Sequence, residues 1–472
     1  MAKKYRMTMP RHRLLIAAAA VAAVSAASIA YAAPATKPLG FRHTVLDPQG
    51  SYGEPSLAIT KDGKHIAVCV PGGSGTYVWY SRNDGNTFGK SKTESQNGGG
   101  DCELDFLPNG DLLNADLEVY DSNVKLSKDF GKTWDAGRSV GVEQDRQWFA
   151  HSADGKTAYL VYHDFAAEGE FMARSTDGGK TWPAQDAAIP VTGTDQAAAP
   201  GNPITPAKPG GPASIVDQGG NTFSGPMLIS PDQREQYVLY SISDLGSNTV
   251  GTTTPPYGPT RGIVVAHKGA EDQTFSNKYA VTSDGTAING AIFPWGTIDK
   301  AGNVYILYNS DAGSPGHFHT YYTVSKDKSK SWSKPVKVDD APMAAGAQVY
   351  ATGQAGAPGV VDIAWYGADA AASPADKAAS WKVHFAQVRN ATSAHPSITR
   401  SVVDADPIHK GDICLNGLLC IAGGDRSLAD FFELAIGPDG LAQIAYADNS
   451  GYGGKAGRVV WAKQTGGRSA LK

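Results

Sequence analysis

The sequence contains few cysteines, only four among 472 residues. None of their spacings is that of a zinc site, so zinc-binding modules are excluded. An even number favours disulfide pairing in an oxidising compartment. Cys414 and Cys420 lie in one glycine-containing loop, whereas Cys69 and Cys102 lie in consecutive repeat units. We predict one disulfide within each pair, with two buried thiols as the alternative.

Basic residues are scarce outside the N-terminus. The first 32 residues hold five of the 42 Lys and Arg residues and none of the 46 Asp and Glu residues, so residues 33–472 carry a formal net charge of −9. No basic patch or stripe is present in the sequence. Such a surface excludes nucleic acid as a favourable partner.

A long apolar run is also missing beyond the N-terminus. Basic residues precede an Ala-rich apolar segment, Leu14–Ile29, which is followed by the small-residue cleavage site Ala30-Tyr31-Ala32. This order predicts a signal peptide over residues 1–32, cleaved after Ala32. We expect a secreted or periplasmic protein with no membrane span in the mature chain.

Cofactor motifs are lacking as well. The sequence has no phosphate-cradling loop, no dinucleotide fingerprint and no EF-hand loop. His317 and His319 could share a strand face, but no third ligand has a matching spacing. We therefore expect no cofactor and no catalytic metal, and a structural calcium ion bound by loop carboxylates remains open.

A short phrase recurs four times, and we call these segments the box turns. They follow S-x-(D/N)-x-G-x-(T/S)-(W/F), with Ser329 in place of glycine in the last, and they are Ser81–Phe88, Ser127–Trp134, Ser175–Trp182 and Ser325–Trp332. Asp or Asn can bond the backbone of a tight turn, and glycine tolerates a positive φ. The phrase therefore predicts a β-hairpin corner repeated once per structural unit.

A second pattern gives the number of units. Two apolar strands flanking a short turn recur seven times, at Leu57–Val70, Leu104–Leu117, Trp148–Tyr162, Met227–Tyr240, Trp295–Tyr308, Val349–Trp365 and Leu434–Tyr446. With a third strand and a box-like turn after most of them, they predict an all-β fold, a seven-bladed β-propeller of four-stranded antiparallel blades. Six blades is the fallback. We expect residues 33–472 to form one domain and the protein to be a monomer.

With these turns, the chain resembles the secreted Asp-box (BNR-repeat) proteins of the sialidase-like superfamily. The phrases Gly53–Ile59 and Asp145–Ala150, and the segment Cys414–Asp430, also look like this group. The resemblance implies a propeller whose box turns lie opposite the active site. It also implies a Tyr–Glu pair, an Asp acid/base and three arginines. Here Arg42-His43-Thr44 stands where the family has Arg-Ile-Pro, and the family has six blades.

Alignment of the units on their first turn predicts a site at one channel mouth. Residues two apart on a strand share a face, so side chains at the starts of the innermost strands should converge. The candidate catalytic residues are Glu54, Asp101, Glu103 and Asp145, and the candidate substrate-binding residues are Arg146, Trp148, Trp295, Arg426, Glu433 and Tyr452.

A carboxylate cluster with arginine and aromatic rings is typical of glycoside hydrolysis. One carboxylic acid would protonate the leaving oxygen, its partner would act as base or nucleophile, and aromatic faces would hold sugar rings. We therefore expect a glycan or polysaccharide partner. Two other functions stay open: a non-catalytic propeller that binds glycan or protein, and a polysaccharide lyase with His163 as its base.

Overall fold

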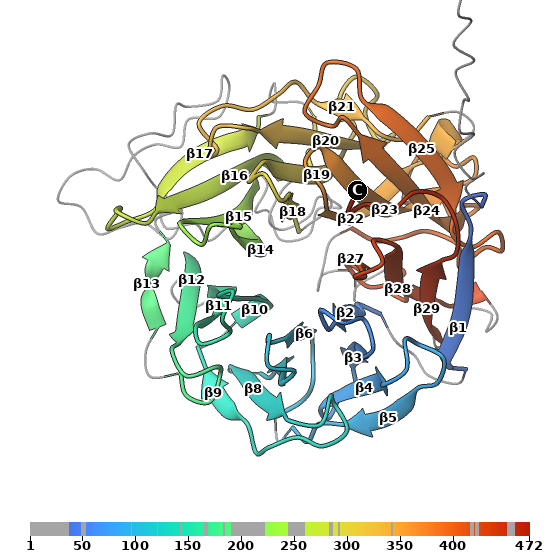
Figure 1. Ribbon diagram of the computed structural model, residues 1–472. Helices are drawn as coiled ribbons and strands as arrows, with labels where there is room; N and C mark the ends of the chain where they lie inside the picture. Colours follow the sequence, from blue (N-terminus) through green and yellow to red (C-terminus); the bar gives the residue numbers. More distant parts are fainter. Residues whose placement is uncertain are drawn as a thin grey trace, which may run out of the picture. The chain divides into compact units, whose positions relative to one another are not determined.

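The computed structural model describes residues 37–48, 53–95, 97–119, 121–141, 144–164, 169–182, 185–189, 222–243, 260–282, 287–290, 293–340, 343–415, 420, 424–450 and 458–472. The predicted signal peptide and Tyr452 lie outside these ranges. Within them the chain forms seven antiparallel sheets arranged as a β-propeller (Figure 1), which confirms the predicted fold and number of blades. No helix in the described ranges is long and apolar enough to cross a membrane.

The first three blades each use four consecutive strands, given from the channel outward. Blade 1 contains β2 (Ser56–Ile59), β3 (Ile66–Pro71), β4 (Thr76–Ser81) and β5 (Gly89–Lys92). Blade 2 contains β6 (Cys102–Phe106), β7 (Leu112–Leu117), β8 (Ser122–Ser127) and β9 (Arg138–Val140). Blade 3 contains β10 (Gln144–His151), β11 (Ala158–Asp164), β12 (Gly169–Ser175) and β13 (Gln185–Ile189).

The next three blades repeat this order. Blade 4 contains β14 (Thr222–Ile229), β15 (Glu235–Ser243), β16 (Thr260–Gly269) and β17 (Ser276–Val281). Blade 5 contains β18 (Trp295–Ile298), β19 (Val304–Ser310), β20 (His319–Ser325) and β21 (Val336–Lys337). Blade 6 follows the short 3-10 helix η3 (Met343–Ala345) and contains β22 (Gln348–Ala355), β23 (Val360–Ala368), β24 (Ser380–Arg389) and β25 (Ser397–Val402), with β26 (His409–Lys410) beside β24.

Blade 7 joins the two ends of the described chain. It contains β27 (Glu433–Ile436), β28 (Ala442–Asp448), β29 (Arg458–Gln464) and, as its outermost strand, β1 (Phe41–Asp47). Thr44 pairs with Trp461 across this junction. The same edge contacts blade 1, because Arg42 donates to the backbone oxygen of Asp84 at 2.9 Å and Lys463 pairs with the Asp84 carboxylate at 2.7 Å.

The second strand of a blade is apolar on both faces because neighbouring blades cover both. Every residue of β11, β19, β23 and β28 is buried. A strand covered on both sides carries a nearly continuous Val, Ile and Tyr run instead of an alternating pattern. The seven predicted hairpins are therefore the first two strands of the seven blades.

The box turns connect the third and fourth strands of blades 1, 2, 3 and 5. In the third one, Ser175 Oγ donates to Asp177 and accepts from the N–H of Gly179 at 2.9 Å. Asp177 accepts from the N–H and the hydroxyl of Thr181 at 2.9 and 2.7 Å. The fourth turn repeats these bonds although Ser329, with φ at 58°, replaces the glycine.

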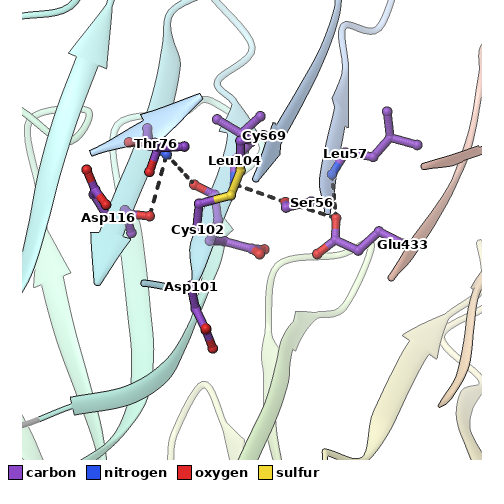
Figure 2. The surroundings of a disulfide bond; sticks show 12 residues. Ser56, Leu57, Cys69, Thr76, Asp101, Cys102, Leu104, Asp116 and Glu433 are labelled. Atoms are coloured by element: carbon purple, nitrogen blue, oxygen red, sulfur yellow. Dashed lines mark hydrogen bonds between the residues drawn. A yellow bond between two sulfur atoms is a disulfide. The ribbon is translucent and has the colours of Figure 1, made fainter. Parts of the chain in front are cut away.

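Both predicted disulfides are present. Cys69–Cys102 joins β3 of blade 1 to β6 of blade 2 (Figure 2), and Cys414–Cys420 closes a short loop before blade 7. Their presence is consistent with an oxidising compartment. In an antiparallel blade the first and third strands run the same way. The first hairpin turn and the box turn therefore share one face, and the innermost strand begins at the other.

Candidate functional site

Three of the innermost strands begin with unusual backbone conformations. Glu54, Arg146 and Tyr350 have positive φ values of 53°, 39° and 56°. The strand pairing is shifted by bulges between Asp145 and Trp148 in β10 and next to Tyr350 in β22. Bulges re-aim side chains and recur beside functional sites.

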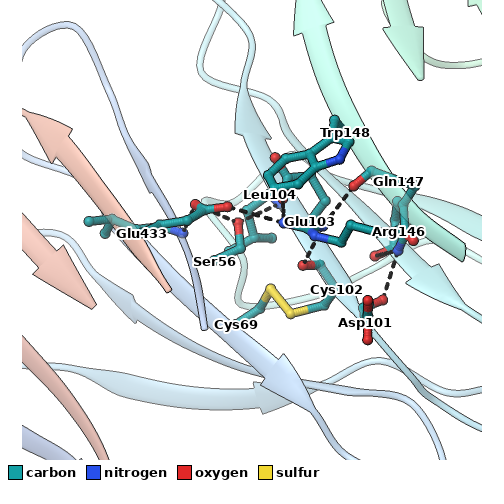
Figure 3. A network of polar contacts seen from close by, with 12 residues as sticks. Ser56, Cys69, Asp101, Cys102, Glu103, Leu104, Arg146, Gln147, Trp148 and Glu433 are labelled. Atoms are coloured by element: carbon teal, nitrogen blue, oxygen red, sulfur yellow. Dashed lines mark hydrogen bonds and ion pairs between the residues drawn. A yellow bond between two sulfur atoms is a disulfide. The ribbon is translucent and has the colours of Figure 1, made fainter. Parts of the chain in front are cut away.

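Arg146 lies at the centre of a buried network (Figure 3). Its Nη2 donates to Glu103 Oε2 at 2.8 Å and to Glu433 Oε1 at 3.3 Å, and its Nη1 donates to the backbone oxygen of Gln147 at 2.6 Å. Arg146 therefore links blades 2, 3 and 7. A side chain with no exposed surface cannot contact a substrate without rearrangement.

The two carboxyl partners of Arg146 are also buried. Glu433 accepts from the Ser56 hydroxyl at 3.0 Å and from the N–H of Leu57 at 2.7 Å. Burial, followed by the neighbouring Glu103 carboxyl, raises the pKa of Glu433 well above its ordinary value. Burial also raises the pKa of Glu103, against the opposing charge of Arg146. One arginine thus faces two carboxyls that resist joint ionisation.

Aromatic rings surround this network. The Arg146 guanidinium lies 3.7 Å from the ring centre of Trp148 and 3.9 Å from that of Phe431. The cluster consists of Trp148, Phe223, Phe293, Trp295 and Phe431, from blades 3, 4, 5 and 7, with neighbouring ring centres 5.3–6.4 Å apart. We call Arg146, Glu103, Glu433 and these rings the central plug, because rings from opposite blades meet across the channel.

The two predicted tryptophans belong to this plug. Trp148 is 1% exposed, and its indole N–H donates to the backbone oxygen of Ser224 at 3.1 Å. The indole of Trp295 donates to the backbone oxygen of Gly353 at 2.7 Å. Trp148 has no open face for a sugar ring in this structure. Both rings tie neighbouring innermost strands together.

Four other carboxyls gather where the innermost strands begin, and we call them the mouth carboxyls: Glu54, Asp101, Asp145 and Asp430. Glu54 interacts electrostatically with Asp101 and Asp430, and Asp145 interacts with the same two residues. Asp101 and Asp145 are partly exposed, whereas Glu54 and Asp430 are each 5% exposed. The structure thus brings four predicted or flanking acids together from blades 1, 2, 3 and 7.

Burial and crowding raise the pKa of three of the mouth carboxyls. Burial, then the charge of Asp101, raises the pKa of Asp145 to about 7. Burial likewise raises the pKa of Asp430 to about 6, with Arg426 acting in the opposite direction. For Glu54, burial and then Asp101 and Asp430 raise the pKa well above its ordinary value. Asp145 and Asp430 therefore titrate close to neutral pH.

Arg426 is the cation of this cluster. Its Nη2 lies 2.5 Å from Asp430 Oδ2 and 3.4 Å from Glu54 Oε1. Glu54 also accepts from the N–H of Asp430 at 3.1 Å. A Cβ on Gly53 would lie 2.4 Å from that of Ala429, so glycine permits this close approach. Glu54 and Arg426, 372 residues apart in sequence, are therefore neighbours in space.

Tyr350 completes the cluster, and the sequence alignment of the units missed it. It lies 5% exposed beside Glu54, Arg426 and Asp430, and burial raises its pKa well above the ordinary value. β22 and β10 carry the same bulge, so Tyr350 takes the place of Arg146 in its unit. The match was hidden because the sixth unit has Pro358-Gly359 where the third has the turn Asp154-Gly155. Among the described residues, one arginine contacts this Tyr–Glu pair, whereas sialidases are expected to use three.

The remaining histidine candidates have structural contacts. His317 bonds the backbone oxygen of Gly346 at 3.1 Å, and His319 bonds Asp339 at 2.7 Å. His163 is 1% exposed and lies between Glu170 and Thr222. Within the described ranges, no group of three or more His, Cys, Asp or Glu side chains is arranged to hold a metal ion.

Comparison with known proteins gives the fold and no family. No protein-family model and no curated protein matches the chain. Among solved structures, hydrazine synthase of Kuenenia stuttgartiensis is 12% identical over 91% of this chain and 99% of its own, with a TM-score of 0.51. At that identity the likeness supports the propeller fold alone.

Two further solved structures are similar at lower scores. A Dyadobacter fermentans protein of unknown function is 12% identical over 90% of this chain and 99% of its own, with a TM-score of 0.49. The GH93 α-L-arabinofuranosidase of Fusarium graminearum, in complex with arabinobiose, is 13% identical over 91% of this chain and 98% of its own, with a TM-score of 0.46.

Proposed function

We propose that this chain is an exported, sialidase-like glycoside hydrolase that works at the mouth carboxyls. The observation that carries the proposal is the pair of partly exposed acids Asp101 and Asp145, because glycoside hydrolysis needs two carboxyls with different protonation states. Asp145 is the general acid, since its pKa of about 7 keeps it protonated at mildly acidic pH. Asp101 is the base or nucleophile.

The neighbours of this pair have positioning roles in the proposal. The Gln147 amide donates to the backbone oxygen of Asp101 at 2.7 Å and holds that residue at the mouth. Arg426 fixes Glu54 and Asp430, and its Nη1 has no hydrogen-bond partner in the described part of the chain. That nitrogen is buried as well as unpaired, so a sugar oxygen would reach it only after a rearrangement at the mouth.

Turnover of a glycan panel by Asp145→Asn and Asp101→Asn tests the proposal, with reducing ends as the readout. We expect a loss of about 100-fold or more for each variant, because removal of general acid–base catalysis costs that order. Wild-type activity should fall as pH rises above about 7, where Asp145 loses its proton. Glu271→Gln, with its side chain 89% exposed, is the matched control and should keep full turnover.

Unchanged turnover in both variants, with circular dichroism showing intact folding, would remove the hydrolase assignment. A second candidate then takes its place: a non-catalytic propeller that binds glycan or protein. The central plug favours it, because Glu103, Arg146 and Glu433 satisfy one another and Trp148 is enclosed. Glycan binding without released reducing ends, in wild type and variants alike, is the result that this second candidate predicts.

A further inference from the structure

A cavity lies at the other end of the channel, on the face of the box turns. It has a volume of about 570 Å³ and is lined by the ends of innermost strands and their hairpin turns. This size is within the usual range for small-molecule sites. Its lining includes residues that follow the central network along the innermost strands. Leu57 comes directly after Ser56, Leu104 directly after Glu103, and Ala435 shortly after Glu433. The plug therefore separates this cavity from the mouth carboxyls.

An acid–imidazole pair stands in the cavity wall. His151, the last residue of β10, places Nδ1 2.6 Å from Oδ2 of Asp105 on β6. Both side chains are 23% exposed. The charge of Asp105 raises the pKa of His151, and no bond of Nε2 is seen to any described residue. An imidazole oriented in this way presents one N–H as a donor.

The rest of the wall offers further polar groups beside apolar surface. Gln354 is exposed, and its side-chain oxygen accepts from the N–H of Ile436, so its amide hydrogens are left as donors. Phe106 and Ile436 supply apolar surface. Donors, a carboxylate acceptor and apolar faces in one cavity suit a ligand that is polar at its edges and apolar on its faces.

The charges around the cavity balance. Lys61 and His151, whose pKa the charge of Asp105 raises, oppose Asp105 and Asp62, while burial lowers the pKa of His65. A balanced set gives no net attraction for an anion or a cation. We propose that this cavity is a second site, which binds a neutral saccharide unit through His151, Asp105 and Gln354.

This inference is independent of catalysis at the mouth carboxyls. Binding of D-xylose, L-arabinose, D-galactose and lactose to the full chain, measured by calorimetry, tests it. We expect saturable binding of at least one sugar that weakens tenfold or more in His151→Ala and in Asp105→Asn. Because both side chains are partly exposed, both variants should fold, and circular dichroism checks this. Asp145→Asn should retain this binding event.

Three results would overturn the second site: no saturable binding of any of the four sugars, equal binding by wild type and His151→Ala, or loss of all binding in Asp145→Asn alone. Tighter binding of benzoate than of the sugars would contradict the neutral class of ligand. Turnover in Asp145→Asn tests the hydrolase proposal separately. The failure of one proposal is therefore distinguishable from the failure of the other.

Discussion

At the scale of single residues, the site is governed by the cost of burying charge. Arg146 has no exposed surface, and it faces Glu103 and Glu433 at 2.8 and 3.3 Å. Isolated charges in such a position are strongly unfavourable, whereas a paired and hydrogen-bonded set is tolerated. The rings of Trp148 and Phe431 complete the enclosure, so removal of Arg146 leaves two buried carboxyls without their cation.

Arg146→Met should therefore lower the free energy of unfolding by about 3–5 kcal/mol, the usual cost of breaking a buried ion pair. Urea unfolding measures the loss. Arg234→Met is the matched control, because its side chain is 60% exposed and its change should stay within about 0.5 kcal/mol. Adding Glu433→Gln to Arg146→Met should restore part of the loss. A loss below about 1 kcal/mol in the single variant would contradict this account of the plug.

The same residues show how far sequence reasoning reached. Glu54, Asp101 and Asp145 were predicted to converge because strand starts meet at one mouth, and their mutual electrostatic interaction agrees. Sequence reasoning did not predict that Arg146 and Trp148 would be buried, since depth in the channel depends on bulges and on rings from other blades. Tyr350 was missed for another reason: the sixth unit has Pro358 at the turn position that holds Asp154 in the third, so the reference point of the alignment was not recognised.

At the scale of elements, the first box turn depends on its glycine. Gly85 has a φ of 70°, and an added Cβ would lie 2.1 Å from the ring of Trp461 on β29. This turn of blade 1 thus packs directly against blade 7. Gly302, in the first hairpin of blade 5, has a similar φ of 83° but no atom within 4 Å of an added Cβ. Alanine substitution at Gly302 therefore tests backbone strain alone, whereas substitution at Gly85 tests backbone strain and packing together.

Gly302→Ala should cost about 1 kcal/mol, from the positive φ alone. Gly85→Ala should cost a further 1–3 kcal/mol or so, because the new methyl group overpacks against a buried tryptophan. The difference between their thermal unfolding midpoints is the measurement. Equal midpoints for the two variants would mean that Trp461 moves aside freely and that the contact between blades 1 and 7 is loose.

At the scale of the whole propeller, the sequence predicted the repeated blades but not the pairing of β1 with β29 that closes the ring. Each blade's hairpins join residues close in sequence, so apolar runs and turn residues reveal them. The pairing of Phe41 with Gln464 joins opposite ends of the described chain, and nothing near either residue indicates it. A prediction from repeats alone gives the number of blades but does not say which strand completes the last one.

Closure by β1 should nevertheless contribute strongly to stability. Without β1, the edge of β29 would be unpaired, and the contacts of Arg42 with Asp84 and with the ring of Trp461 would be lost. We expect a chain that begins at Gly53 to melt about 5 °C below one that begins at Lys37, since in a domain of this size each kcal/mol lost lowers the midpoint by about 1 °C.

Adding a synthetic peptide of residues 37–48 to the shortened chain tests whether β1 causes this difference, because an open sheet edge accepts an added strand. The peptide should raise the midpoint of the shortened chain towards that of the longer one, and a scrambled peptide of the same composition should not. Equal midpoints for the two chains would show that the ring is held by its inner contacts alone. Those contacts are the plug around Arg146 and the Cys69–Cys102 bridge, which lie on the channel side of the outermost strands.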